Sequence, residues 1–295
     1  MQRGSEVAAG VAYAVTAYGL WGAFPIYWRW IGAVPAREVI APRILFTALV
    51  MLGLLAVARR GGELRAGGFG RRRWLATAAA AATLAVNWFV FIYAVEVRRI
   101  VDTSLGYYIN PLVAISLGML VLGERLTRPQ GLAVGIAAVG VAYLTWATGS
   151  LPWISAVLAV SFALYGLAHK LSPQPAFGGL ASEMLLLSPL AIGWWLWLSA
   201  RDEAVLRSAP AGLKAAVALS GVVTAVPLLY FHAAARRLPF VAVGMFQFIS
   251  PTLTLLLAVA LYGEPFTAAH AWSFGCVWLG LGLFSWDALR RAGRF

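Results

Sequence analysis

The feature that most constrains this chain is a series of apolar blocks, each long enough to cross a lipid bilayer. A membrane-spanning helix needs about 20 predominantly apolar residues. Ten such blocks are present, near residues 7–28, 36–57, 74–95, 101–122, 129–147, 151–168, 178–198, 213–235, 240–261 and 268–288. Each block must satisfy its own backbone polar groups inside the bilayer, which helices do and single strands do not. We therefore predict an all-α, polytopic membrane protein with ten transmembrane helices.

The composition agrees with this prediction. Hydrophobic residues make up 61% of the chain and charged residues 12%, whereas soluble domains have roughly 45–50% apolar and roughly 25% charged residues. The formal net charge is +12, which could indicate a nucleic-acid partner. However, the arginines stand in short runs between the apolar blocks, as at Arg71, Arg72 and Arg73, which is typical of membrane-flanking charges. We expect the lipid bilayer and no nucleic acid as partner.

The distribution of Lys and Arg predicts the orientation. If the N-terminus is cytoplasmic, the inner segments hold 15 of these residues and the outer loops seven. An excess of Lys and Arg marks the cytoplasmic side of a membrane protein. We therefore expect both termini in the cytoplasm and the chain in the inner membrane of a bacterium.

An internal repeat is the most informative pattern along the chain. A shift of 140 residues aligns the following pairs: Ile109 with Ile249, Pro111 with Pro251, Leu117 with Leu257, Gly123 with Gly263, Glu124 with Glu264, Thr127 with Thr267, Gly135 with Gly275, Gly140 with Gly280 and Trp146 with Trp286. A weaker correspondence, at a different shift, pairs Glu38 with Glu183. Because five helices per half is an odd number, the second copy must enter the membrane inverted. We predict two inverted five-helix repeats, residues 1–147 and 148–295, around a central cavity.

Motifs of membrane enzymes and pumps are absent from the sequence. It contains no G-x-x-x-x-G-K-[ST], H-E-x-x-H or G-x-S-x-G motif. His169 and His270 are interpreted as helix-end residues and His232 as a packed or bridging side chain, while the single cysteine, Cys276, has no partner for a disulfide. We expect no catalytic residue, no metal and no cofactor.

Ionisable residues within the apolar blocks are functional candidates, because a charge at the helix centre costs about 2.5–3.5 kcal/mol on insertion scales. Glu38, Asp102 and Glu183 are candidates for ion coupling or gating, with snorkelling to the interface as the alternative. Arg43 lies about two turns into its helix. It either binds substrate or pins its helix through an ion pair, for example with Asp102.

Uncharged polar residues add a second set of candidates. We predict that one central cavity is lined by Arg43, Asn87, Trp88, Tyr107, Asn110 and Gln247. Pro111 and Pro251 should bend their helices at corresponding depths, where inverted-repeat transporters place their substrate sites. The alternative is that these polar groups are hydrogen-bonding contacts between helices.

These residues resemble the RarD-type permeases of the drug/metabolite transporter superfamily, whose members carry EamA-type repeats. The resemblance covers nearly the whole chain. It is carried by Tyr18 to Gly22, Pro35 to Glu38, Asn87-Trp88, Ser104 to Leu112, Leu122 to Arg125, Phe162 to Gly166, Thr224 to Leu229, Phe246 to Leu253 and Tyr262 to Glu264. Two features depart from the family's pattern, namely Val97 to Arg99, where a more polar stretch is common, and Pro42, where a histidine is common. Roles of such histidines cannot be transferred to this chain.

The resemblance implies ten helices around a central cavity, cytoplasmic termini and alternating access. We expect a secondary transporter, a permease or exporter, for a small organic metabolite or drug, and the predicted cavity suits an amphipathic or aromatic solute with a polar or anionic group. One alternative is an intramembrane enzyme or lipid-handling protein, which would need a convergent acid, base or metal cluster. Another is a receptor or structural subunit. Kinship of fold does not name a ligand.

Overall fold

The chain folds into a bundle of helices. The computed structural model describes residues 2–64, 70–97, 99–147, 149, 153–172, 174–201, 205–263 and 266–292, and these contain helices but no strand. The helices are α1 (Gln2–Gly22), α2 (Phe24–Trp30), α3 (Ala36–Val57), the 3-10 helix η1 (Gly61–Leu64), α4 (Arg71–Glu96), α5 (Ile100–Leu122), α6 (Arg128–Ala147), α7 (Trp153–Leu171), α8 (Ala176–Ala200), α9 (Val205–Ser208), α10 (Ala211–Arg237), α11 (Phe240–Gln247), α12 (Ile249–Tyr262) and α13 (Ala268–Ala292).

Nine helical segments in the described part of the chain are long and apolar enough to cross a membrane. They coincide with the first nine predicted blocks and run from Ser5–Trp30 to Phe240–Leu261. The tenth predicted block lies in α13, which is 25 residues long but carries three tryptophans, His270 and Asp287 and does not reach the same hydropathy. The all-α, polytopic prediction is therefore confirmed, with nine spans by this measure.

Large apolar side chains cover much of the outer surface. Leu190 exposes 71% of its surface and Leu49 60%, and both lie in the middle of long helices, α8 and α3. A soluble monomer rarely exposes apolar area on this scale. Lipid chains would cover these side chains, so their exposure is what a membrane-embedded bundle requires.

Two of the long apolar segments are interrupted. α1 and α2 are separated at Ala23, just before Pro25, and α11 and α12 at Phe248, just before Pro251. Pro111, by contrast, lies inside the continuous α5. A proline leaves the carbonyl four residues earlier without its helical donor, which here frees the carbonyls of Tyr107 and Gln247. The prolines at corresponding positions therefore disturb both helices, but only the second helix is broken.

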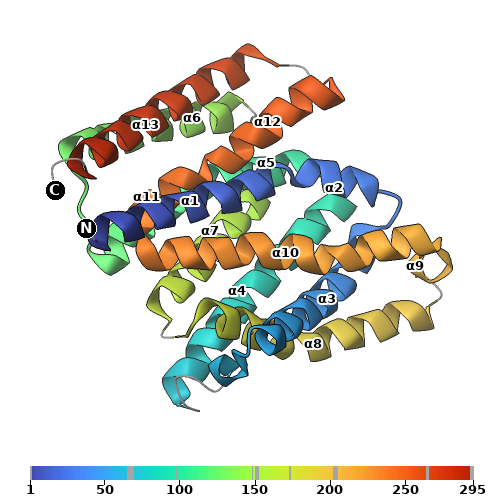
Figure 1. Ribbon diagram of the computed structural model, residues 1–295. Coiled ribbons are helices and arrows are strands. Elements are labelled where there is room, and N and C mark those ends of the chain that lie inside the picture. Colours follow the sequence, from blue (N-terminus) through green and yellow to red (C-terminus); the bar gives the residue numbers. More distant parts are fainter. Residues whose placement is uncertain are drawn as a thin grey trace.

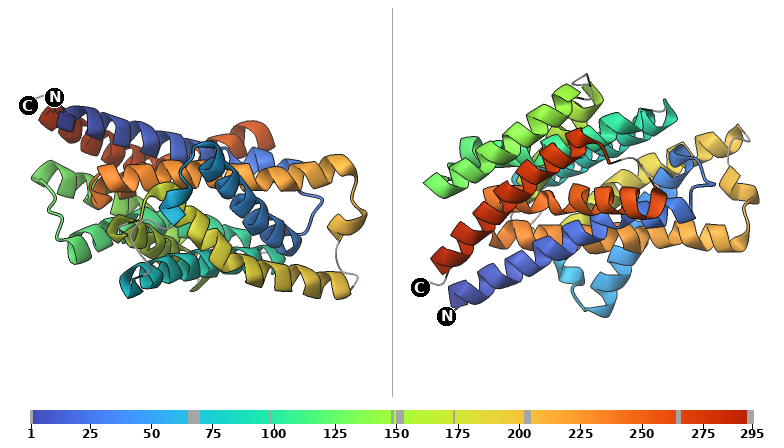
Figure 2. Two further views of the ribbon diagram at one scale, coloured as in Figure 1. Left: turned by 60° about the horizontal axis from the view of Figure 1, so that its bottom comes forward. Right: turned by 90° about the horizontal axis from the view of Figure 1, so that it is seen from above.

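The helices of the two halves pack against each other in pairs (Figures 1 and 2). The main pairs are α6 with α13, α1 with α10, α4 with α7, α3 with α8, α3 with α10, α5 with α7, α5 with α11 and α1 with α12. All eight of these pairs join a helix of residues 1–147 to one of residues 148–295. The two halves are thus intertwined rather than side by side, and a site at their interface is formed by residues from both.

The helix boundaries follow the 140-residue shift of the sequence pattern. α3, α4, α5 and α6 begin at residues 36, 71, 100 and 128, and α8, α10, α11 and α13 begin at residues 176, 211, 240 and 268, so each start is shifted by 140. Gly123 and Gly263, which end α5 and α12, both have left-handed backbones, with φ of 66° and 67°, which glycine adopts without strain. In this register Glu38 corresponds to Gly178, and Glu183 corresponds to Arg43. The separate shift that pairs Glu38 with Glu183 is therefore not supported.

Candidate functional site

Arg43 is placed by a close approach of α3 and α10. A Cβ added to Gly221 of α10 would lie 2.5 Å from the backbone carbon of Phe46 in α3, so a glycine lets these two helices touch. One turn along each helix, Nε of Arg43 donates a hydrogen bond of 2.7 Å to Oγ1 of Thr224. The Thr224 hydroxyl thereby fixes the guanidinium between the two halves of the chain.

Aromatic rings surround this guanidinium. Its central carbon lies 4.2 Å from the ring centroid of Trp88 in α4 and 5.7 Å from that of Trp28 in α2, within the range of cation–π attraction. Tyr107 of α5 lies close enough to interact electrostatically with it. We call Arg43, Trp28, Trp88, Tyr107 and Thr224 the Arg43 cluster. It unites three of the six predicted cavity residues.

The Arg43 cluster has an unsatisfied charge. Among the residues that the structure describes, no carboxylate lies within 4 Å of Arg43, and its terminal nitrogens have no hydrogen-bonded partner there. Arg43 is partly exposed, and Tyr107 exposes 45% of its surface. A guanidinium has five N–H donors that match a carboxylate. The cluster can therefore accept an anionic group, with flat rings beside it.

The two asparagines hold helices together. Nδ2 of Asn87 donates to the carbonyl oxygen of Leu158 and to Oγ of Ser161, both at 3.0 Å, and Nδ2 of Asn110 donates to the carbonyl oxygen of Ala159 at 3.2 Å. Both side chains are buried. They attach α4 and α5 to α7, which is the alternative role considered from the sequence, and they are not part of the Arg43 cluster.

Gln247 is the last residue of α11. Its side chain is buried beside the hydroxyl of Tyr18 in α1. Oε1 of Gln247 and the Tyr18 hydroxyl are both buried without a hydrogen bond that has good geometry. Gln247 therefore lies next to the break between α11 and α12.

Glu38 caps a short helix of the other half. Its Oε1 accepts a hydrogen bond of 3.0 Å from the N–H of Val205, and its Oε2 one of 2.8 Å from the N–H of Leu206. These are the first residues of α9, where N–H groups lack partners within the helix. Glu38 is fully buried, so it has not snorkelled, and its two oxygens fasten α3 to α9.

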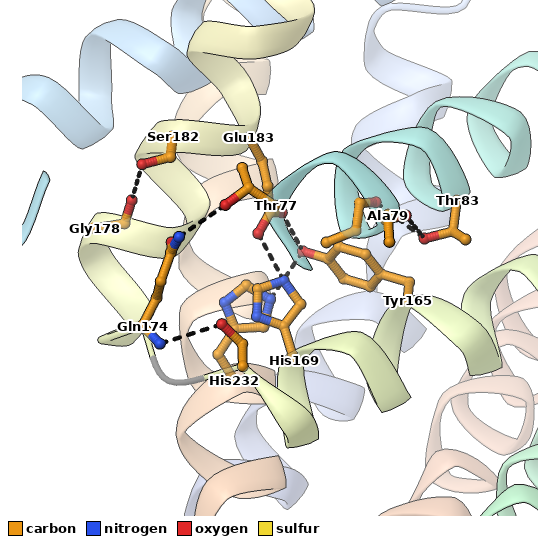
Figure 3. A network of polar contacts seen from close by, with 12 residues as sticks. Thr77, Ala79, Thr83, Tyr165, His169, Gln174, Gly178, Ser182, Glu183 and His232 are labelled. Carbon is orange, nitrogen blue, oxygen red and sulfur yellow. Dashed lines mark hydrogen bonds and ion pairs between the residues drawn. The ribbon is translucent and has the colours of Figure 1, made fainter. Parts of the chain in front are cut away.

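Glu183 belongs to a cluster that was not expected from the sequence (Figure 3). Its Oε1 lies 2.8 Å from Nε2 of His169 in α7, and its Oε2 accepts a hydrogen bond of 3.2 Å from the Tyr165 hydroxyl. That hydroxyl is also 2.8 Å from Nε2 of His232 in α10. The rings of His169 and His232 are stacked, with centroids 3.4 Å apart. We call Tyr165, His169, Glu183 and His232 the histidine cluster.

The side chain of Asp102, the third residue predicted for ion coupling or gating, lies outside the described residues. An apolar groove of about 620 Å³ between α5 and α6 is lined by residues that include Ile109, Leu112, Val141 and Trp146. None of the predicted cavity residues lines this groove, so it is not the polar site that the sequence predicts.

Comparison with known proteins decides the family. The model of the EamA-like transporter family matches residues 8–146. An uncharacterized transporter of Pseudomonas aeruginosa is 41% identical, with 97% of this chain and 96% of that protein aligned. Protein RarD of Escherichia coli is 39% identical, with 95% of each chain aligned. This chain belongs to the RarD-type transporters of the EamA family.

Membership of the RarD type also settles the broad class. The relatives are named as transporters or as RarD proteins, so this RarD-type chain is a transporter of the drug/metabolite superfamily and not an enzyme. A solved crystal structure aligns with 95% of it at a TM-score of 0.73 and 19% sequence identity. That likeness shows a shared fold.

The sequence did not reveal several residues of the two clusters in this RarD-type transporter. Trp28 has the position of an interfacial tryptophan, and the histidines stand on separate segments. Only the packing of α7, α8 and α10 brings Tyr165, His169, Glu183 and His232 together. The usable signal was that His232 lies well inside an apolar helix, where a polar side chain needs a partner.

Proposed function

We propose that this chain is a secondary transporter of the bacterial inner membrane that moves a small organic anion with an aromatic part by alternating access. The observation that carries this proposal is Arg43, a charge within a membrane helix that has no described carboxylate partner and lies near two indole rings. Its desolvation is costly. An anionic substrate group would offset that cost, and the rings would hold an apolar part.

Alternating access is supported by a mutual contact between the halves. A Cβ added to Gly140 of α6 would lie 2.7 Å from the carbonyl oxygen of Ser273 in α13, and one added to Gly280 of α13 would lie 2.6 Å from the carbonyl oxygen of Ala133 in α6. Ala133 and Ser273 are 140 residues apart, as are the glycines. Such reciprocal contacts are what a twofold axis produces, and in transporters that axis relates inverted repeats.

The placement of the termini supports ten spans. The start of α1 and the end of α13 lie at the same end of the bundle (Figures 1 and 2). A chain whose ends are on one side of a membrane crosses it an even number of times. The proposal therefore includes α13 as the tenth span, inverted repeats of residues 1–147 and 148–295, and cytoplasmic termini.

The proposed substrate class can be tested by binding. We expect carboxylates to bind more tightly than amides of the same size, because a hydrogen bond to a charged group is worth about 1.5–3 kcal/mol, or roughly a factor of 10 to 100 in affinity. Thermal-shift titrations would compare benzoate with benzamide, hippurate with hippuramide and indole-3-acetate with indole-3-acetamide. The proposal is wrong about the anion if every amide binds as well as its carboxylate.

Chloramphenicol is a useful further ligand in that panel. A relative from Pseudomonas aeruginosa that is 30% identical is named chloramphenicol-sensitive protein RarD. Chloramphenicol is aromatic but uncharged, so the proposal predicts weaker binding than for the carboxylates. Tighter binding than all three carboxylates would favour a neutral drug as the substrate.

A further inference from the structure

The histidine cluster is a second ionisable site, buried in the second half of the chain. Its side chains come from α7, α8 and α10 and meet near the ends of these helices that carry Leu171, Ala176 and Arg237. Exposure of the His169 side chain is 8% and that of the Glu183 side chain 2%. The cluster is thus nearly dry, and any proton that it holds is shared among few groups.

The geometry limits the number of protons in the cluster. Two imidazolium charges at the 3.4 Å ring separation would repel strongly in a protein interior, so the stacked rings hold at most one added proton between them. Glu183 offers the matching charge at 2.8 Å from Nε2 of His169, a contact with ion-pair distance but without hydrogen-bond alignment. One proton on the ring pair therefore neutralises one carboxylate.

Tyr165 connects the two histidines into one unit. Its hydroxyl can donate to Oε2 of Glu183 or to Nε2 of His232, so protonation of one ring changes the hydrogen bonding of the other. The remaining ring nitrogen, Nδ1 of His232, is buried. When the Tyr165 hydroxyl donates to Glu183, Nε2 of His232 carries the ring hydrogen, and Nδ1 is then the nitrogen that can accept an added proton.

We propose that the histidine cluster binds one exchangeable proton and couples its movement to transport. The coupling rests on the proposed function, because that function supplies the transported solute. The proton site itself does not depend on it. Loading transfers a proton from water to the ring pair, and unloading returns it to water, so no other reactant is needed. Without the proton Glu183 is a buried carboxylate beside neutral rings, which is costly. Separation of α7, α8 and α10 would relieve that cost by admitting water.

Hydrogen bonds link the chain segments around the histidine cluster. Nε2 of Gln174 donates to Oγ1 of Thr77 in α4 at 2.7 Å, Arg236 donates to the carbonyl oxygen of Gln174, and Lys170 donates to the carbonyl oxygen of Leu238 at 2.5 Å. Among the ionisable groups of the surrounding elements, Arg236 of α10 interacts electrostatically with His232, Lys170 follows His169 in α7, and Glu63 of η1 accepts a hydrogen bond from the N–H of Gly178 in α8.

The internal repeat relates the position of Glu183 to that of Arg43. In the shared register Arg43 and Glu183 are each the eighth residue of the second long helix of their halves. One half carries a fixed cation there and the other an acid. If the halves are inverted, the two clusters face opposite ends of the bundle, where an anion and a proton would be bound and released.

The proton site can be tested without a substrate. The chain has three histidines, so a His270→Gln variant leaves only His169 and His232 for ¹⁵N-histidine NMR in nanodiscs between pH 5 and 9. We expect the two rings to gain one proton between them. The additional Glu183→Gln substitution should lower the midpoint by roughly one to three pH units, because it removes the negative charge that favours the protonated rings. Glu96→Gln, which removes a carboxylate paired with Arg37, should leave the midpoint unchanged. No proton uptake, or one full proton on each ring independently, would refute the site.

Coupling is tested by transport of labelled hippurate in proteoliposomes with the membrane potential clamped. A pH gradient should drive accumulation, by about tenfold per pH unit if one proton accompanies each anion, beyond the leak of protein-free liposomes. Glu183→Gln should keep hippurate exchange but lose this accumulation. Exchange by the unaltered protein with no response to the gradient would refute coupling alone. No hippurate exchange at all would refute the proposed function and the coupling with it, while NMR still decides the proton site.

Discussion

Replacing Arg43 by glutamine should lower the affinity for an aromatic carboxylate by at least about 30-fold, since loss of one partner from a buried charged pair costs about 2–5 kcal/mol. The affinity for the matching amide should change little, because the rings of Trp28 and Trp88 remain. The measurement is a thermal-shift or calorimetric titration with hippurate and hippuramide. Arg43→Lys should recover part of the carboxylate affinity, since it keeps the charge but not the planar array of donors.

The chain offers a matched control for this substitution. Arg201 stacks on Trp197 at 4.2 Å, the same distance as Arg43 on Trp88, but it lies on the exposed surface. Arg201→Gln should leave both affinities unchanged. If Arg43→Gln instead lowers the melting temperature of the ligand-free protein and weakens both ligands equally, Arg43 is a structural residue and the proposed anion site is wrong.

Replacing Gly140 or Gly280 by leucine should destabilise the pairing of α6 with α13. Each new side chain would meet a backbone carbonyl closer than 3 Å, and backbone cannot yield as a side chain can. Overpacking costs about 1–3 kcal/mol and sometimes more, which corresponds to a fall in melting temperature of about 2–4 °C per kcal/mol in a chain of comparable size. The two substitutions should have similar effects. Together they should cost less than their sum, because either one already separates the helices.

Gly135 and Gly275 provide the control for this prediction. They lie in the same two helices and are related by the same repeat, but an added Cβ at either would meet nothing within 4 Å. Leucine at these positions should be neutral or stabilising, because leucine favours helix more than glycine does. Equal losses of stability at all four glycines would contradict the close, reciprocal contact between α6 and α13.

The sequence predicted the helices better than it predicted the sites. Apolar length alone located nine spans, because the bilayer imposes that length on every helix. The repeat could also be recognised in the sequence, because Gly123 and Gly263 occupy backbone positions that favour glycine. The sequence did not show which residues come together in the Arg43 cluster and the histidine cluster. Asn87 and Asn110 have the same polarity as cavity residues but donate to carbonyls of α7, and only the three-dimensional packing distinguishes these roles.

The carboxylates show the same limit. Glu38, Asp102 and Glu183 looked equivalent from the sequence, as acids near helix starts. Glu38 caps α9 through both oxygens, whereas Glu183 contacts a histidine and a tyrosine. A carboxylate's role depends on which N–H, O–H or ring lies opposite to it, and those partners are 18 to 168 residues away in the chain for the contacts Tyr165–Glu183 and Leu206–Glu38.

The central claim is that this chain carries an anionic solute through a site formed by Arg43, and solute counterflow tests it most directly. Purified protein would be reconstituted in liposomes loaded with unlabelled hippurate and diluted into a trace of labelled hippurate. The account predicts a transient, saturable accumulation of label that is absent from protein-free liposomes, strongly reduced by Arg43→Gln and retained by Arg201→Gln. Hippurate binding without counterflow in the unaltered protein, or full counterflow by Arg43→Gln, would contradict it.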